Sequence, residues 1–195
     1  MKAVQFREHG GRDVITYDEY GDIEPGRDEV RIEVKAGALN HLDVWTRRGL
    51  PGLALEMPHI LGSDAAGVVE STGEGVTRFE EGDRVAVLAG VSCGDCEFCR
   101  DGDPTRCVSF HLLGEHVRGV HAEYPVVPAD NLVPVPEGVD WETAAAAPWY
   151  SRRPGECSSP GATSGRESRY SCWARAAASA TPPSRSPTIV IHRSY

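Results

Sequence analysis

The sequence contains no run of about 18 or more apolar residues, so it predicts no membrane-spanning helix in its 195 residues. Lysine is nearly absent: Lys2 and Lys35 stand beside 18 arginines, and the net charge is −9. Residues 1–149 hold 13 Lys and Arg against 27 Asp and Glu. Because a nucleic-acid-binding domain needs a basic face, this composition argues against that class of function. The acidic, lysine-poor balance is a hint of a high-salt, halophilic cytoplasm.

The first residues also lack the apolar core of a secretory signal peptide. The segment Met1–Arg7 is interrupted by Lys2, Gln5 and Arg7 itself. We therefore expect a cytoplasmic protein with neither a membrane nor a nucleic acid as partner. In that compartment cysteines are more often reduced or metal-bound than paired in disulfides.

Four of the six cysteines lie within fifteen residues, at Cys93, Cys96, Cys99 and Cys107. The spacing C-x2-C-x2-C-x7-C allows neighbouring thiolates to turn toward one centre. Zinc takes four such ligands at tetrahedral corners, and four thiolates leave no position open for a substrate. The pattern therefore predicts a structural zinc that stabilises a loop at about 90–112.

Three other states of these cysteines compete with zinc. Two disulfides would require an oxidising compartment. An iron–sulfur cluster also uses C-x2-C-x2-C, but the ferredoxin pattern has a shorter last spacer and a proline where Val108 stands. Four unpaired thiols in so short a segment are the remaining alternative. The spacing favours zinc over all three.

The hydrophobic pattern predicts a mainly β fold. The clearest strand is 28–39, where Val30, Ile32 and Val34 alternate with charged residues, so that one face is buried and the other is wet. Further strands are expected at 2–7, 13–19, 66–72, 82–88, 121–127 and 132–135. Many short strands with frequent glycine indicate a barrel or a sandwich.

Two short helices complete the expected elements. Asn40 can cap the start of one helix and Gly49 can end it. The other begins after Asp140, which is the expected cap, and continues through an alanine-rich segment.

Several motifs resemble those of the medium-chain dehydrogenase/reductase family. They are Gly62-x-Asp64-x-x-Gly67-Val68-Val69, Gly82-Asp83-Arg84-Val85, Ala38-Leu39-Asn40-His41-Leu42-Asp43, the four-cysteine loop and the alanine-rich segment 143–147. The resemblance covers residues 1–147 and implies the GroES-like N-terminal barrel of zinc alcohol dehydrogenases and quinone oxidoreductases. It also implies a structural zinc, NAD or NADP as cofactor of the full-length protein, and a small carbonyl, alcohol or enone as substrate.

Four positions depart from the members of that family that bind a catalytic zinc. Those members have Cys where this chain has Asn40, His-Glu where it has Ser63-Asp64, and a proton-relay hydroxyl where it has Leu42. Asn and Ser are poor zinc ligands beside thiolate and imidazole. The resemblance therefore implies a structural zinc and argues against a catalytic one.

Asn40 and His41 are the candidate catalytic and cofactor-binding residues. The resemblance places His41 next to the cofactor's pyrophosphate and nicotinamide, where it could contact phosphate or help protonate a substrate. It could equally pack at the start of a helix. Asn40 could bond cofactor or substrate, or only cap the helix. Asp43 and Asp64 could support this site or simply be solvated.

Four further histidines form a loose set: His59, His111, His116 and His121. They could hold a second metal, although scattered surface histidines explain them as well.

Residues 148–195 do not continue the resemblance. Residues 150–195 hold ten Ser, five Pro and seven Arg, a composition that predicts disorder. Read one nucleotide earlier, the codons of Cys172-Trp173-Ala174 force Leu-Gly, and the next codons permit the rest of a glycine-rich dinucleotide-binding turn. We therefore expect a one-nucleotide frameshift between about Ala144 and Trp149. A genuine low-complexity tail is the alternative.

The expected organisation is thus a GroES-like domain at 1–147, with a zinc lobe at 90–112, followed by an out-of-frame tail at 148–195. We expect no dehydrogenase activity from this chain by itself, and a homo-oligomer only for the full-length form. The alternative function is a non-enzymatic, zinc-stapled β-barrel used for binding.

Overall fold

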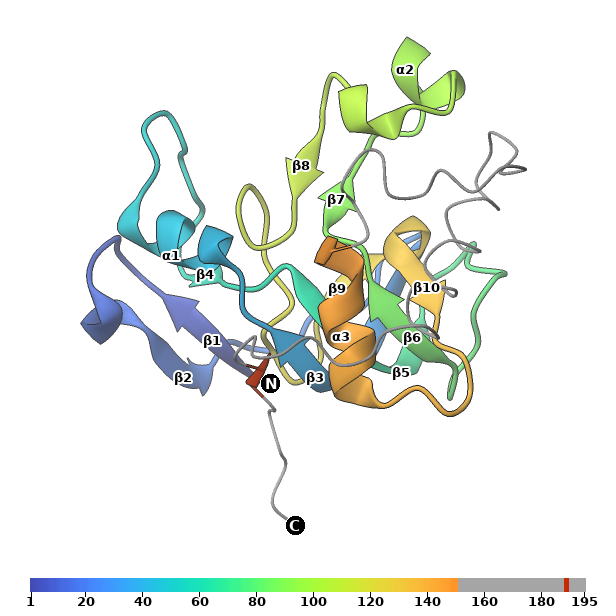
Figure 1. The fold of residues 1–195 in the computed structure, drawn as a ribbon, viewed down its shortest axis with the longest axis horizontal. Helices are drawn as coiled ribbons and strands as arrows, with labels where there is room; N and C mark the ends of the chain where they lie inside the picture. Colours follow the sequence, from blue (N-terminus) through green and yellow to red (C-terminus); the bar gives the residue numbers. More distant parts are fainter. Residues whose placement is uncertain (151–187, 190–195) are drawn as a thin grey trace.

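The computed structural model describes residues 1–150 and 188–189, and its fold is mainly β, as expected (Figure 1). The strands are β1 (Lys2–Phe6), β2 (Thr16–Glu19), β3 (Glu29–Ala38), β4 (His59–Ile60), β5 (Asp64–Thr72), β6 (Arg84–Val87), β7 (Gly90–Val91), β8 (His111–Leu112), β9 (Val126–Pro128), β10 (Leu132–Pro134) and β11 (Thr188–Ile189). The helices are α1 (His41–Arg48), α2 (Glu97–Arg100) and α3 (Trp141–Tyr150), with short 3₁₀ turns at Arg12–Val14, Pro104–Arg106 and Ala129–Asn131.

The main sheet has the strand order β10-β6-β5-β3-β11, and β9 also pairs with β3. Antiparallel pairing joins β3 to β5 along most of their length. The register shifts twice along β3, between Arg31 and Ile32 and between Val34 and Ala36. Irregularities of this kind increase the local twist and bend a strand, so they help to curl the sheet into a half-barrel.

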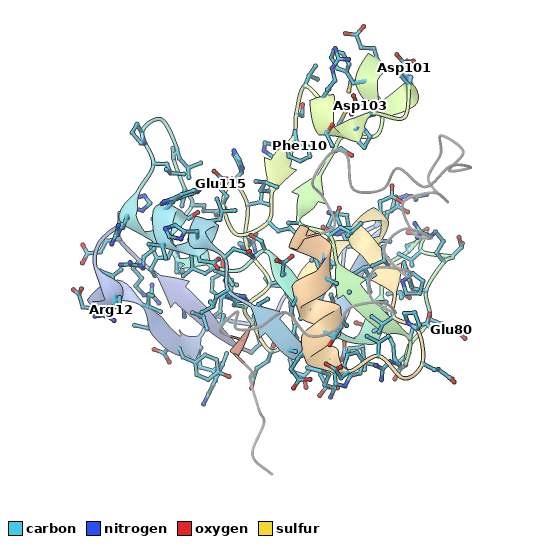
Figure 2. The ribbon with its side chains drawn as sticks, in the orientation of Figure 1. Arg12, Glu80, Asp101, Asp103, Phe110 and Glu115 are labelled. Carbon is cyan, nitrogen blue, oxygen red and sulfur yellow. The ribbon has the colours of Figure 1, made fainter. Side chains whose placement is uncertain are left out.

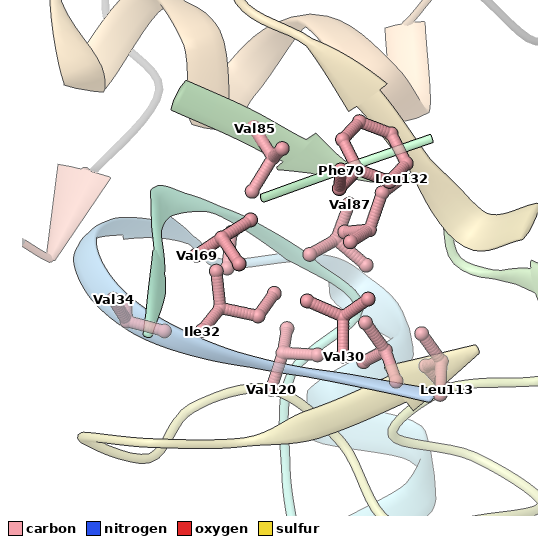
Figure 3. Close-up of a cluster of buried hydrophobic side chains, with 12 residues drawn as sticks. Val30, Ile32, Val34, Val69, Phe79, Val85, Val87, Leu113, Val120 and Leu132 are labelled. Carbon is pink, nitrogen blue, oxygen red and sulfur yellow. The ribbon is translucent and has the colours of Figure 1, made fainter. Parts of the chain in front are cut away.

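The core lies on the inner face of this curled sheet. The predicted alternation in β3 is confirmed, because Val30, Ile32 and Val34 are buried while the charged residues between them are not. Figure 3 shows these side chains packed against β5, β6, β10 and the segment that carries Leu113 and Val120. Burial of this apolar cluster is the main force that closes the half-barrel.

Helix α3 packs on the other face of the sheet (Figure 1). Its Ala144 and Ala145 contact a cluster of small residues on the strands, which lets helix and sheet approach closely. The predicted Asp140 cap is confirmed, since Oδ1 of Asp140 accepts the N–H of Thr143 at 2.8 Å. The helix ends at Tyr150, three residues beyond the expected domain boundary at 147.

Two of the expected strands are wrong in detail. Residues 13–19 are not one strand, because a 3₁₀ turn occupies Arg12–Val14 and β2 begins only at Thr16. Residues 121–127 are mostly irregular, although backbone bonds tie this segment to both β1 and β3. Pro125 has no N–H to donate, so a regular ladder cannot continue through it.

The predicted disorder and frameshift fall mainly on residues 151–187 and 190–195, which lie outside the described residues. Thr188 and Ile189 pair with Ala38 and Gly37 at the end of β3. Among the described residues, no helix is both long and apolar enough to span a bilayer.

Candidate functional site

The four predicted cysteines converge in a lobe that projects from the barrel (Figure 1). Their sulfurs all lie within 4.8 Å of one another. The Sγ–Sγ distance is 3.4 Å for Cys93 and Cys107, 3.4 Å for Cys96 and Cys99, and 4.0 Å for Cys93 and Cys99. A tetrahedral zinc with Zn–S bonds near 2.3 Å separates its sulfurs by about 3.8 Å. The cluster therefore fits one zinc ion with four thiolate ligands.

Backbone N–H groups of the lobe already point at the sulfurs. The N–H of Cys93 donates to Sγ of Cys107, and the N–H of Cys96 donates to Sγ of Cys93. A backbone N–H bond from Cys99 lowers the pKa of Cys96 to about 6, whereas desolvation raises the pKa of Cys99 to about 12. Without a cation the four sulfurs cannot all be thiolates together. A divalent metal supplies the charge that would hold all four deprotonated.

The lobe has little apolar content of its own. Phe98 is half-buried under the guanidinium of Arg106, whose carbon lies 4.4 Å from the ring centroid. Figure 2 shows Asp101 and Asp103 on the outer part of the lobe. So small a core cannot order the segment alone, which is the situation in which a metal site contributes folding free energy.

A second constellation lies where β3 ends and β5 begins. The amide Nδ2 of Asn40 donates to Oδ2 of Asp64 at 2.8 Å. The carboxylate of Asp43 accepts two backbone N–H groups, from Asn40 at 2.7 Å and from Gly62 at 3.1 Å. Asn40 occupies the N-cap position of α1, as predicted, and forms a capping box with Asp43, while its Nδ2 is directed to Asp64. Together these bonds tie the start of α1 to the loop before β5.

The burial of Asp43 and Asp64 decides between a site role and simple solvation of these two carboxylates. Asp43 and Asp64 are both buried, at 6% and 1% exposure, so the interpretation of them as solvated acids is wrong. Ser63 is fully buried and its hydroxyl donates to the carbonyl of Leu113 at 2.8 Å. Buried polar groups are usually hydrogen-bonded, and each of these three side chains makes at least one of the hydrogen bonds described above.

The comparisons with known proteins identify the domain. Residues 26–137 match the family "Alcohol dehydrogenase GroES-like domain". The chain belongs to this family. It is 38% identical to an alcohol dehydrogenase of Schizosaccharomyces pombe, over 73% of this chain and 41% of the relative. It is 37% identical to a quinone oxidoreductase of Pseudomonas aeruginosa, over 74% of this chain and 36% of the relative.

Solved structures give the same result. A crystal structure of an NAD-dependent alcohol dehydrogenase superposes with a TM-score of 0.75 and 46% identity, covering 77% of this chain and 44% of that one. The chain thus spans about two fifths of the length of the relatives that it matches.

His41 and Leu42 lie on opposite sides of α1 in this family domain. His41 is exposed, and its ring centroid lies 5.1 Å from that of Trp45, which is 50% exposed. Leu42 is buried. The helix therefore presents an imidazole and an indole to the outside, at a spacing of one turn.

The loose set of histidines does not form one cluster. His111 and His116 lie near each other, with ring centroids 5.7 Å apart, whereas His59 and His121 are buried and face different carbonyl oxygens, those of Gly114 and Ala38. Within residues 1–150, the four cysteines are the one group whose ligand atoms converge closely enough for a metal ion. A second metal at the histidines receives no support from this geometry.

Gly62 and His121 lie next to the Asn40–Asp64 constellation, and the sequence did not reveal this proximity. Gly62 donates its N–H to Asp43, and its backbone lies against the ring of His121. Gly62 had been singled out as part of a motif, but its partner is 59 positions away and no local pattern links the two.

Proposed function

We propose that residues 1–147 form the substrate-side domain of an NAD(P)-dependent oxidoreductase that acts on a small carbonyl, alcohol or enone. The observation that carries this proposal is the membership of the alcohol dehydrogenase GroES-like family, together with the match to an NAD-dependent alcohol dehydrogenase. In this proposal the cofactor supplies the hydride chemistry when bound. The domain supplies one wall of the cleft and the groups that orient the substrate.

His41 and Asn40 are the residues we propose at the nicotinamide. His41 is exposed at the first turn of α1, where an imidazole can reach phosphate or exchange a proton with a substrate oxygen. Asn40 is held in one orientation by Asp64, so its amide oxygen has a fixed direction. A group that is held in place before binding loses less entropy when it contacts a substrate.

We propose a zinc at the four cysteines and none at Asn40. The pair Asn40 and Asp64 is joined by a hydrogen bond, and the hydroxyl of Ser63 is committed to Leu113. Neither thiolate nor imidazole is offered at these positions, so this donor set does not fit a catalytic zinc. The zinc at the lobe is structural, because four thiolates complete its coordination.

We also propose that the domain ends near residue 147, and that residues 148–195 are read out of frame. Sequencing of the genomic DNA across codons 140–180 tests this directly. An insertion or deletion near codon 147 is the expected result. An intact reading frame would contradict the frameshift and make residues 148–195 a genuine tail.

A measurement of cofactor binding distinguishes the proposed oxidoreductase from the alternative, a zinc-stapled binding module. We expect the 195-residue chain to show no turnover of NADH or NADPH with small enones, aldehydes or alcohols, and the frame-restored protein to show both cofactor binding and turnover. Turnover by the 195-residue chain would overturn the proposed inactivity. A frame-restored protein that binds neither cofactor would overturn the oxidoreductase.

A further inference from the structure

The imidazole of His121 lies between two glycines, one in a strand and the other in a loop. Its ring contacts Gly37 near the end of β3 and Gly62 in the loop before β5. A Cβ on Gly37 would lie 3.2 Å from Cδ2 of the ring, and a Cβ on Gly62 would overlap the ring itself. Only glycine at position 62 leaves room for the ring, which is 5% exposed, whereas a Cβ at Gly37 would make a tight contact.

Hydrogen bonds join His121 to three separate segments. Its Nε2 lies 3.3 Å from the carbonyl oxygen of Ala38, its backbone N–H donates to Leu61, and its carbonyl accepts from Val4. Because a carbonyl oxygen only accepts, Nε2 must carry the proton in this arrangement. The neutral ring then has an unprotonated Nδ1.

Two of the three segments that His121 joins carry the Asn40–Asp64 pair. Ala38 comes two residues before Asn40, and Gly62 comes two residues before Asp64. The carboxylate of Asp43 closes the same unit by accepting the N–H groups of Asn40 and Gly62. The β3–β5 ladder pairs Ala38 with Asp64, and the ring packs beside this end of the ladder. A change in the gap filled by the ring would therefore act on the segments that carry the Asn40–Asp64 bond.

We propose that His121 is a positioning residue for the Asn40–Asp64 pair. Its ring sets the separation between the end of β3 and the Gly62 loop, and its Nε2–H fixes the carbonyl of Ala38. Asn40 is thereby held in the orientation in which it meets a substrate; this last step rests on the proposed function, whereas the positioning itself does not.

The test uses the zinc-loaded 195-residue chain with His121→Phe, which keeps a ring but removes the donor, and His121→Gln, which can donate but has no ring. The exposed His111→Phe is the matched control. Hydrogen exchange measured by NMR reports on the backbone N–H groups of Asn40 and Gly62. We expect their protection to fall at least about tenfold in His121→Phe, to recover in part in His121→Gln, and to stay unchanged in the control.

The amides of β6 distinguish positioning from general packing. We expect their protection to be unchanged in His121→Phe, because β6 pairs with β5 at Ala66, Gly67 and Val68, whereas the ring lies at Gly62 and bonds to Ala38. Unchanged protection at Asn40 and Gly62, or an equal loss in β6, would overturn the proposal. If His121→Phe does not fold, the imidazole ¹⁵N chemical shifts of the unmodified protein still test the proposal. We expect the neutral His121 ring to carry its proton on Nε2, and a proton on Nδ1 instead would contradict the proposal. None of these readouts uses cofactor or turnover, so failure of the oxidoreductase function would leave them unaffected.

Discussion

Asn40 and Asp64 are joined by a 2.8 Å hydrogen bond from amide to carboxylate, at the point where β3 ends and β5 begins. The bond links the first residue of β5 to the cap of α1. Asn40 stands where the resemblance to zinc alcohol dehydrogenases puts a cysteine ligand, and Asp64 follows Ser63, which stands where it puts a histidine ligand. An amide is a poor zinc ligand beside a thiolate, which is why the proposed chemistry at this site relies on the cofactor and on His41.

The Asn40–Asp64 bond predicts a specific pH effect for Asn40→Asp. Two carboxylates at hydrogen-bond distance cannot both ionise without cost, so the pKa of one of them would rise. We expect the variant to lose about 2 kcal/mol of unfolding free energy at neutral pH, and the loss to shrink as the pH falls and one carboxyl takes up a proton. Urea denaturation at several pH values measures this.

Asn40→Ala is the control for that experiment. It removes the same hydrogen bond without adding a charge, so its loss of stability should not shrink as the pH falls. An equal pH dependence in the two variants would mean that Asn40 and Asp64 do not lie next to each other.

Gly62→Ala should be much more damaging than Gly52→Ala. Both glycines have positive φ, +102° and +82°, so both variants carry backbone strain of about 1 kcal/mol. A Cβ at Gly52 meets open space, whereas a Cβ at Gly62 overlaps the ring of His121. We expect a loss of roughly 3 kcal/mol or more for Gly62→Ala, against roughly 1 kcal/mol for Gly52→Ala, in thermal or urea unfolding. Similar losses for the two variants would show that the ring does not lie against Gly62.

Two buried histidines predict a loss of stability in mild acid. Burial lowers the pKa of His59 and of His121 below the usual 6.5. Below about pH 6.5 these histidines become protonated in the unfolded chain but stay neutral in the folded chain. The free energy of unfolding therefore falls as the pH drops toward the folded pKa values. Each histidine contributes a slope of at most about 1.4 kcal/mol per pH unit.

Urea denaturation from about pH 7.5 to about pH 5.5 measures this slope above the range in which most carboxylates titrate. His59→Phe should flatten it, and replacement of the exposed His111 by Gln should not. A stability that does not change over this range would contradict the burial of both imidazoles in their neutral form.

Local patterns were sufficient to predict much of the fold. The alternation in 28–39 identified β3, and Asn40 and Gly49 marked the ends of α1. The short spacing of the cysteines predicted their convergence, because ligands within fifteen residues depend little on the rest of the fold. In each case the residues that interact are close together in the sequence, and a local sequence pattern predicts such interactions well.

The errors and omissions arise where distant segments decide the structure. Residues 121–127 have the composition of a strand, but their bonds are divided between β1 and β3 and interrupted at Pro125. His121 looked like one of several scattered histidines. Its contacts with Gly37 and Gly62 depend on how the sheet curls, and single-sequence patterns do not contain that information.

The zinc content of the purified 195-residue chain tests the account most directly. We expect one zinc per chain by elemental analysis, lost in Cys93→Ser and retained in Cys172→Ser, Asn40→Ala and Asp64→Ala. That result would place the metal at the four cysteines and leave the Asn40–Asp64 pair without one. Two zinc ions per chain, or zinc lost when Asn40 or Asp64 is replaced, would contradict the account.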